Sequence, residues 1–356
     1  MFKIEMLPAG HGDCLWIEYG DSEAPRRILI DGGATGIYTR VLRPKLRALS
    51  EKERCFELLM VSHIDADHIT GVLELLEDKD VGFRANDIWF NGYRHLPNEN
   101  PDTLGPVQGE KLTDLLVKPK ISWNAAFGKA AVVLPVGDKL PRVELEGGLV
   151  LTLLSPTPAK LADLKPTWEK EVRKAGLDPN MKRPEDIETP EGFELLGGAP
   201  DVDALAGEPF SEDSAEANGS SIAVLAEFEG RRMLLTGDAH PSVLTAAIKR
   251  LGTGGKLTVD ACKLPHHGSK ANVSRQLLQA LDCKTYLFST NGAYFKHPDL
   301  QAVARVIKWG GAQPELVFNY RTQYNDIWAG KPLRERHGYT AVFAKSDADG
   351  GVLEWR

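Results

Sequence analysis

The stretch Ser62-His63-Ile64-Asp65-Ala66-Asp67-His68-Ile69-Thr70-Gly71 places four side chains that can bind a metal ion within six residues. Residues 56–61 before it are short and apolar enough for a buried strand, and residues 69–76 after it carry apolar side chains at helical spacing. We therefore predict a loop between a strand and a helix. Such loops open at the carboxyl ends of strands, where α/β folds bind their ligands. The stretch is interpreted as one half of a two-metal site.

The composition is typical of a globular protein. The chain has 356 residues, of which 42% are hydrophobic and 26% charged. No apolar run approaches the roughly 20 residues that a membrane helix needs, and residues 1–7 do not resemble a secretory signal. Four isolated cysteines without a Cys-x-x-Cys pair favour free, buried thiols in a reducing compartment. We therefore expect a cytoplasmic protein without a membrane partner.

The charge of the chain bears on nucleic-acid binding. A formal net charge of -7 argues against a surface that binds nucleic acid along its whole length, because such binding needs Lys and Arg to neutralise phosphates. A local basic groove stays compatible with this charge. Residues 320–336 interleave four basic residues with three aromatic ones, a pattern that could stack on bases, although an ordinary polar loop is the alternative.

Two parts of the chain are predicted to share one order of elements: a hairpin, an acid at the strand end, a helix, a strand and a histidine at its end. The elements of the first part are strands 14–19 and 26–30, Asp31, helix 39–50, strand 56–61 and His63. Those of the second part are strands 221–228 and 232–235, Asp238, helix 241–251, strand 259–264 and the pair His266-His267. This repetition predicts two βα layers whose strand ends converge on one edge.

The other segments complete the predicted organisation. Strands are expected at residues 88–90, 132–134, 149–154, 285–289, 316–318 and 339–343, and helices at 167–175 and 297–309. Residues 156–217 are acidic and contain recurrent prolines, which indicates an insertion: a lid, an interaction surface, a partly disordered segment or a plain solvated loop. We otherwise expect one domain over residues 1–356.

These residues resemble the metallo-β-lactamase superfamily. His63-x-Asp65-x-Asp67-His68 stands in the place of its His-x-His-x-Asp-His, Asp31 in that of its early acid and Asp238 in that of its later bridging acid. The similarity is greater still to the metallohydrolase domain of the ComEC competence proteins, without their membrane domains, over about residues 1–345. The motifs shared with that group are Gly10-His11-Gly12-Asp13, Asn218-x-x-Ser221, Thr236-Gly237-Asp238, His266-His267-Gly268-Ser269 and His297-Pro298.

The resemblance implies an α/β fold of the αββα sandwich type, with two mixed β-sheets flanked by helices. It also implies two divalent metal ions. The expected ligands are His63 and Asp65 for one ion, Asp67, His68 and one histidine of the pair 266–267 for the other, and Asp238 as the bridge. Of the pair, His266 is preferred because it is nearer the strand end, and His267 is the alternative. Asp65 replaces a superfamily histidine, so the oxygen-rich site favours Mn²⁺, with Zn²⁺ or Mg²⁺ as alternatives. Asp31 is expected to orient the loop of His63 without touching a metal.

The remaining candidates would act on the substrate. The expected catalytic residues are Asp67, Asp238, His267, which would contact substrate or support a ligand, and His297, which would protonate a leaving group. Asn218, Ser221 and Lys270 are expected to bind substrate phosphate. The structural alternatives are a strand-end cap for the first two, an ordinary exposed lysine for Lys270, and a structural histidine before a helix for His297.

Two functional hypotheses follow. The first is a metal-dependent phosphodiesterase of the ComEC-like type, a nuclease that cleaves DNA alone or within a multi-protein system. The second is a small-molecule hydrolase that acts on a cyclic nucleotide, phosphonate, lactone or thioester, which a closed lid at residues 156–217 would favour. A degenerate binding scaffold is disfavoured by the intact set of ligand-type residues. Nucleic acid is the expected partner, a protein could bind the acidic insertion, and the sequence indicates no oligomeric state.

Overall fold

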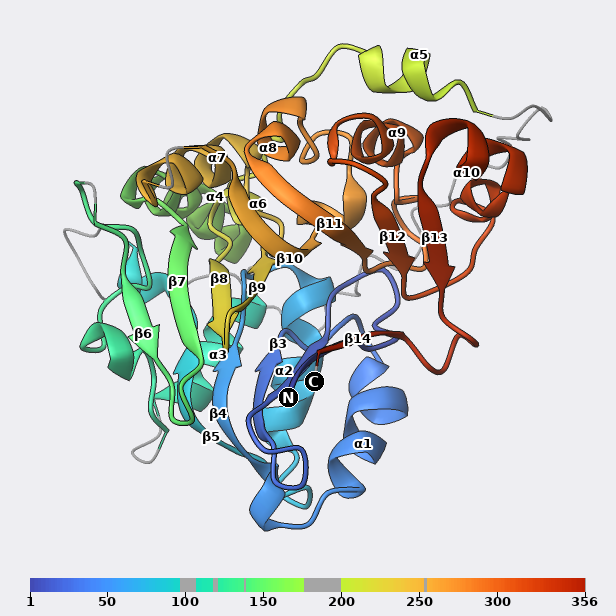
Figure 1. The fold of residues 1–356 in the computed structure, drawn as a ribbon. Coiled ribbons are helices and arrows are strands. Elements are labelled where there is room, and N and C mark those ends of the chain that lie inside the picture. The colour runs from blue at the N-terminus through green and yellow to red at the C-terminus, as the bar shows by residue number, and fades with distance from the viewer. Residues whose placement is uncertain (97–106, 118–120, 138, 176–199, 253–254, 356) are drawn as a thin grey trace.

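The computed structural model describes residues 1–96, 107–117, 121–137, 139–175, 200–252 and 255–355. Within these ranges two mixed β-sheets lie between helices, as Figure 1 shows. The predicted αββα fold class is therefore confirmed. Strands β1 and β14 pair along their whole length, which brings the first and last described residues side by side (Figure 1).

The strands form two sheets. The first has the order β14-β1-β2-β3-β4-β5 and the second the order β13-β12-β11-β10-β9-β8-β7-β6. The strands of the first sheet are β1 (Phe2–Met6), β2 (Leu15–Tyr19), β3 (Arg26–Ile30), β4 (Cys55–Met60), β5 (Arg84–Trp89) and β14 (Gly351–Trp355). Those of the second are β6 (Arg142–Glu144), β7 (Val150–Ser155), β8 (Ala223–Phe228), β9 (Arg231–Leu235), β10 (Leu257–Lys263), β11 (Leu281–Phe288), β12 (Glu315–Phe318) and β13 (Thr340–Phe343).

The helices cover the outer faces of both sheets. They are α1 (Arg43–Arg47), α2 (Ala66–Glu77), α3 (Val107–Leu116), α4 (Pro158–Ala175), α5 (Val202–Gly207), α6 (Glu216–Gly219), α7 (Pro241–Arg250), α8 (Arg275–Gln279), α9 (Leu300–Trp309) and α10 (Lys331–His337). Shorter helical turns are η1 (Tyr38–Leu42), η2 (Lys52–Arg54), η3 (Tyr93–His95), η4 (Ala125–Phe127), η5 (Pro265–Gly268) and η6 (Asp326–Ala329). Among the described residues, no helix is long and apolar enough to span a membrane.

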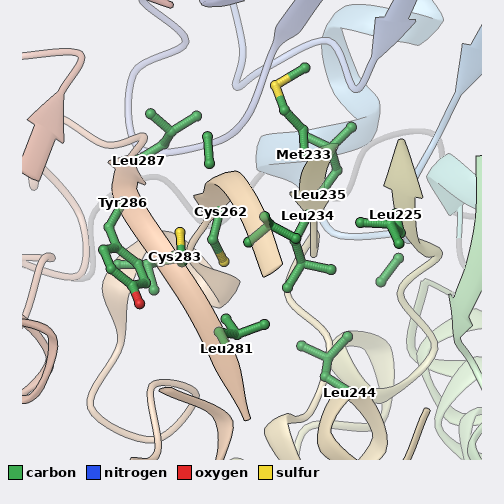
Figure 2. Packing of buried hydrophobic residues seen from close by; sticks show 14 of the residues in the cluster. Leu225, Met233, Leu234, Leu235, Leu244, Cys262, Leu281, Cys283, Tyr286 and Leu287 are labelled. Atoms are coloured by element: carbon green, nitrogen blue, oxygen red, sulfur yellow. The ribbon is translucent and has the colours of Figure 1, made fainter. Parts of the chain in front are cut away.

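Two apolar clusters hold these layers together. One lies between the sheets and continues under α7, α8 and α9, and the other packs α1, α2 and part of α4 against the outer face of the first sheet. Figure 2 shows the first cluster, where Leu225, Leu234 and Cys262 come from neighbouring strands and Leu244 comes from α7. Burial of each such leucine stabilises the fold by about 1.5–3 kcal/mol.

The repeated order of elements predicted from the sequence is present in both sheets. Strands β3 and β4 are parallel neighbours joined through α1, and β9 and β10 are parallel neighbours joined through α7. Parallel neighbours end at the same edge of a sheet. The carboxyl ends of these four strands therefore carry the residues on which the site depends.

Some local predictions need correction. Residues 132–134 form no strand, because the backbone N–H and C=O of Val132 bond to the side chain of Asn91, each at 2.8 Å, instead of to a neighbouring strand. All four cysteines are free as predicted, but Cys55 is exposed at the start of β4. The helix predicted at 167–175 begins earlier, at Pro158. Within the expected insertion, residues 176–199 lie outside the described part of the chain.

Candidate metal centre

Four strand ends bring the predicted site residues to one place. In the first sheet, β3 is followed by Asp31 and β4 by Ser62 and His63. In the second, β9 is followed by Asp238 and β10 by the turn that carries the His266-His267 pair. A backbone hydrogen bond of 2.8 Å from Ile222 N to Ser62 O ties the two sheets together beside the site. The predicted convergence of the two layers is confirmed.

The carboxylate of Asp238 lies at the centre of the cluster. Its Oδ2 atom is 3.5 Å from Nε2 of His68 and 3.6 Å from Nε2 of His267. The same oxygen is 3.8 Å from Nε2 of His63 and 3.9 Å from Nε2 of His266. One buried acid therefore lies between two sets of residues that can bind metals.

One set of atoms has the spacing that a metal ion requires. The Nε2 atoms of His68 and His267 are 3.3 Å apart, and with Oδ2 of Asp238 they form a triangle with sides of 3.3–3.6 Å. The centre of such a triangle lies about 2 Å from each corner, which is the length of a metal–nitrogen or metal–oxygen bond. Oδ2 of Asp67 borders the same triangle, 3.4 Å from His267 and 3.8 Å from His68. These residues fit a divalent cation.

A second set of residues lies beside the same carboxylate oxygen of Asp238. Nε2 of His63 is 3.5 Å from Oδ2 of Asp65 and has no hydrogen-bond partner among the described residues. Oδ1 of Asp238 is also buried without one. Buried polar atoms are normally satisfied, so two unsatisfied atoms at one place point to a missing ligand. The Asp65 side chain is 43% exposed, and the cluster therefore opens to solvent on this side.

The two neighbouring histidines of the turn η5 contact different side chains. His266 and His267 both have left-handed backbone conformations, with φ of 49° and 56°, which cost about 1–3 kcal/mol each. As a result the His267 ring lies against Asp67, whereas Nδ1 of His266 is 3.0 Å from the side-chain oxygen of Asn272. The sequence favoured His266 as the third residue beside Asp67 and His68. The structure instead places His267 beside these two residues, while Nε2 of His266 lies 3.9 Å from Oδ2 of Asp238.

Asp31 holds Ser62 and His68 in place through hydrogen bonds. Its carboxylate accepts hydrogen bonds of 2.7 Å from both the backbone N and the Oγ of Ser62, and lies 2.8 Å from Nδ1 of His68. A carboxylate that accepts the Nδ1 proton leaves Nε2 free to bind a metal. Strand and helix approach closely here, since a Cβ on Gly71 would lie 2.0 Å from the carbonyl oxygen of Gly32. The position of Asp31 agrees with the predicted orienting role.

Asp31→Asn is expected to lower the affinity for a divalent cation about 10- to 100-fold, because the amide cannot hold the His68 ring as the charged carboxylate does. Calorimetric titration with Mn²⁺ measures the affinity. Asp21→Asn, which changes an exposed turn acid, is the matched control and should leave the affinity unchanged. Equal affinities of the Asp31→Asn variant and the unmodified protein would contradict the orienting role.

A buried ion pair lies behind His267. The ammonium of Lys263 contacts the carboxylate of Asp13, donates a hydrogen bond of 3.3 Å to the carbonyl of Gly237 and lies 3.9 Å from Oδ1 of Asp238. Oδ1 of Asp13 is 3.4 Å from Nδ1 of His267. A group of four buried residues offers possible ligand atoms within 4.8 Å of one another: Asp13, His68, Asp238 and His267. Asp13 lies beside Nδ1 of the His267 ring, and we therefore interpret it as a residue that orients this ring.

Sequence reasoning did not assign a role to this ion pair. Asp13 entered only as part of a glycine-rich motif, and Lys263 was missed, although a lysine inside an apolar strand is an unusual choice that signals a buried partner. Asp213, from the predicted insertion, was also missed. Its Oδ2 lies 3.5 Å from Nδ1 of His266 and accepts a hydrogen bond of 3.0 Å from Asn272.

The residues predicted to bind substrate phosphate lie at different depths. Ser221 is fully buried, and its Oγ accepts a hydrogen bond of 3.3 Å from the backbone N of Asp238. Asn218 is also buried and donates a hydrogen bond of 2.7 Å to Asp213. These two side chains therefore bond to the backbone of Asp238 and to Asp213, beside the candidate metal ligands. Lys270 alone of the three has an exposed side chain.

His297, the predicted proton donor, lies close to the cluster. Its ring centroid is 5.4 Å from that of His266. Burial lowers the pKa of His297 to about 3, and the charges of His266 and His267 act in the same direction. The ring is neutral at pH 7, which argues against its role as a protonated acid.

The segment 320–336 contains η6 and most of α10 and is not a surface of exposed aromatic side chains. Trp328 is fully buried, and the hydroxyl of Tyr320 accepts a hydrogen bond of 2.9 Å from the backbone N of Gly10. Tyr324 is half-buried. Two of the three aromatic rings in this segment therefore stabilise the fold and are not available to a base.

The metal-free cluster carries charges of both signs. Burial would lower the pKa of His267, but the charges of Asp238 and Asp13 outweigh it and raise this pKa to about 9. The pKa of His68 is likewise raised well above its ordinary value against the effect of burial, chiefly by Asp238 and Asp67. Despite its burial, the pKa of Asp238 is held well below its ordinary value by His267 and His68. In the metal-free protein these carboxylates therefore favour the protonated form of both rings.

Metal binding at pH 7 is expected to release protons, because His68 and His267 must become neutral to bind a cation. The affinity should rise with pH until the pKa of His267 at about 9 is passed, and it should fall in acid. Titrations with Mn²⁺ in buffers of different ionisation enthalpy count the protons released. An affinity that stays constant between pH 6.5 and pH 9 would contradict the protonation of these two rings in the metal-free protein.

The chain matches one protein family and several solved structures. A family model described as the metallo-beta-lactamase superfamily matches residues 7–292. CmlA, a diiron beta-hydroxylase from Streptomyces venezuelae, is similar with 14% identity and a TM-score of 0.45 over 99% of this chain and 54% of CmlA. The chain thus spans about half the length of CmlA. Human tRNase Z, short form, is similar with 10% identity and a TM-score of 0.42 over 99% of this chain and 98% of that one. No curated protein matches the chain.

Proposed function

The chain belongs to the metallo-beta-lactamase superfamily, which consists mostly of metal-dependent hydrolases. On this premise we propose that it is a two-metal phosphodiesterase that cleaves DNA. The observation that carries the proposal is the position of Asp238, whose Oδ2 lies within 3.9 Å of four imidazole nitrogens. The motifs that resemble the ComEC metallohydrolase domain support the same activity.

The two sets of residues around Asp238 would hold the ions. We assign Asp67, His68 and His267 to one ion, and His63, Asp65 and His266 to the other, with Asp238 shared. Two such ions would bind a hydroxide, polarise a phosphoryl oxygen and stabilise the leaving oxygen. The four imidazoles of this set suit Zn²⁺ and its three carboxylates suit Mn²⁺. We favour Mn²⁺ because Asp65 stands where the superfamily motif has a histidine.

Hydrogen bonds within the chain orient the rings of His267 and His68. Nδ1 of His267 donates a hydrogen bond of 2.9 Å to the backbone oxygen of Ser289, and Nδ1 of His68 donates to Asp31. In both rings this leaves Nε2 facing Asp238. A ring fixed in this way does not have to rotate or exchange its proton position when a cation binds.

The open side of the cluster supports a polymeric substrate. Asp65 is 43% exposed and the side chain of His266 is 20% exposed, so both reach solvent while the other ring nitrogens stay buried. A phosphate within a long chain can approach such a rim without entering a closed pocket. Lys270, which is exposed two residues after η5, would add a positive charge beside that approach.

The test compares substrates and metals. Purified protein is incubated with single-stranded DNA, double-stranded DNA, RNA and bis(p-nitrophenyl) phosphate in Mn²⁺, Mg²⁺ or Zn²⁺. We expect Mn²⁺-dependent cleavage of DNA that is lost in Asp67→Asn and kept in Asp80→Asn, which changes an exposed acid after α2. Hydrolysis of the reporter without cleavage of any nucleic acid would instead favour a small-molecule hydrolase, and activity unchanged in Asp67→Asn would reject the mechanism.

A further inference from the structure

The loop between β11 and α9 exposes two aromatic side chains beside the metal centre. Tyr294 is 52% exposed and Phe295 is 50% exposed, whereas His297 is buried. The other large hydrophobic residues that are exposed in the described part of the chain belong to other elements: Val117, Val136, Phe210, Val342 and Val352. The aromatic pair is thus a local feature of this loop.

Ring contacts connect the pair directly to the candidate metal ligands. Phe295 is stacked on His297 at 5.8 Å and lies 6.3 Å from His266, measured between ring centroids. His266 in turn places Nε2 3.9 Å from Oδ2 of Asp238. Phe295 is therefore separated from the central carboxylate by a single imidazole ring.

Tyr294 extends the same surface. Its ring packs edge-on against Phe295 at 4.5 Å and stacks on His11 at 5.4 Å. His11 belongs to the segment that carries Asp13, which lies against His267. Two separate parts of the chain thus support the exposed rings from below.

The backbone of the loop is fastened at several points. Asn291 N donates a hydrogen bond of 2.8 Å to the carbonyl of Gly10, and Lys296 N donates one of 3.0 Å to the carbonyl of Gly292. The side-chain oxygen of Asn291 accepts a hydrogen bond of 2.9 Å from Ala293 N. A ring held in place in this way loses little conformational entropy when a ligand stacks on it.

We propose that Tyr294 and Phe295 bind an unpaired base of a single-stranded nucleic acid whose neighbouring phosphate lies at the candidate metal centre. This proposal rests on the proposed function. Stacking on an aromatic side chain contributes to binding for every base, because each has a π-face. Bases inside a duplex are covered on both faces by their neighbours, so the surface selects single strands. Two rings expose too little area for a stable protein interface, which needs about 1,000 Å².

The experiment measures binding without cleavage. Fluorescence anisotropy of end-labelled oligonucleotides is recorded with the full chain in Ca²⁺, using a single-stranded oligonucleotide, the same oligonucleotide with abasic sites and a duplex. We expect Tyr294→Ala/Phe295→Ala to weaken binding of the single strand about 10- to 100-fold. The unmodified protein should bind the abasic oligonucleotide weakly, with the same affinity that the double alanine variant has for the normal single strand.

Matched variants separate stacking from folding. Tyr294→Phe/Phe295→Tyr keeps both rings and should bind normally, while Phe295→Leu keeps an apolar side chain without a ring and should bind weakly. Val352→Ala, an exposed apolar residue of β14, should have no effect. If the unmodified protein binds single strands but abasic strands and the alanine variant bind equally well, the stacking proposal is wrong and the nuclease stands. If it binds no nucleic acid, both are wrong.

Discussion

Asp238→Asn is expected to abolish metal-dependent hydrolysis, with a loss greater than the roughly 100-fold effect typical of groups that only orient a ligand. The physical reason is that Oδ2 of Asp238 lies within 3.9 Å of the Nε2 atoms of the histidines in both sets of candidate ligands. Asparagine keeps the size of the side chain but removes the charge that two cations would share. Hydrolysis of bis(p-nitrophenyl) phosphate and the metal content per chain are measured together.

Asp260→Asn is the matched control for this change. Asp260 lies on β10 of the same sheet, and its carboxylate pairs with Arg231 away from the metal centre. The control changes the net charge by the same amount and should leave activity and metal content unchanged. Full activity of Asp238→Asn with a full complement of metal would show that another group carries out the bridging.

Lys263→Met is expected to lower the free energy of unfolding of the metal-free protein by about 3–5 kcal/mol, the effect of breaking one partner of a buried ion pair. Lys263 and Asp13 are both almost completely buried. Although burial disfavours both charges, the pKa of Lys263 is raised by Asp13 and that of Asp13 is lowered by Lys263, so both are charged at pH 7. Without the lysine, the Asp13 carboxylate stays buried with little compensation. Urea unfolding in the presence of a chelator measures the change.

The double variant Asp13→Asn/Lys263→Met should be more stable than Lys263→Met alone, because it removes the uncompensated charge as well. Lys249→Met, which changes an exposed lysine at the end of α7, should shift the stability by less than about 0.5 kcal/mol. Equal stabilities of Lys263→Met and Lys249→Met would show that the buried pair does not stabilise the fold.

The fold class and the convergence of the strand ends followed from local patterns. The strands before Asp31 and Asp238 are recognisable because each ends in three consecutive apolar residues that are buried, directly before the site. The segment 132–134 has the same local character but forms no strand. Its backbone is satisfied by Asn91, a partner distant in the sequence that no local pattern reveals.

The sequence by itself determined most residues of the candidate metal centre, since His63, Asp65, Asp67 and His68 lie within six residues of one another and are all side-chain types that can bind a metal. The tertiary structure alone decided the rest. It decided that His267 and not His266 lies beside Asp67, because the direction of two neighbouring rings depends on the backbone conformation of η5, which no local pattern reveals. It also brought Lys263 to Asp13 across about 250 residues. Such pairs form because burial forces opposite charges together, and only the folded chain defines which residues are buried side by side.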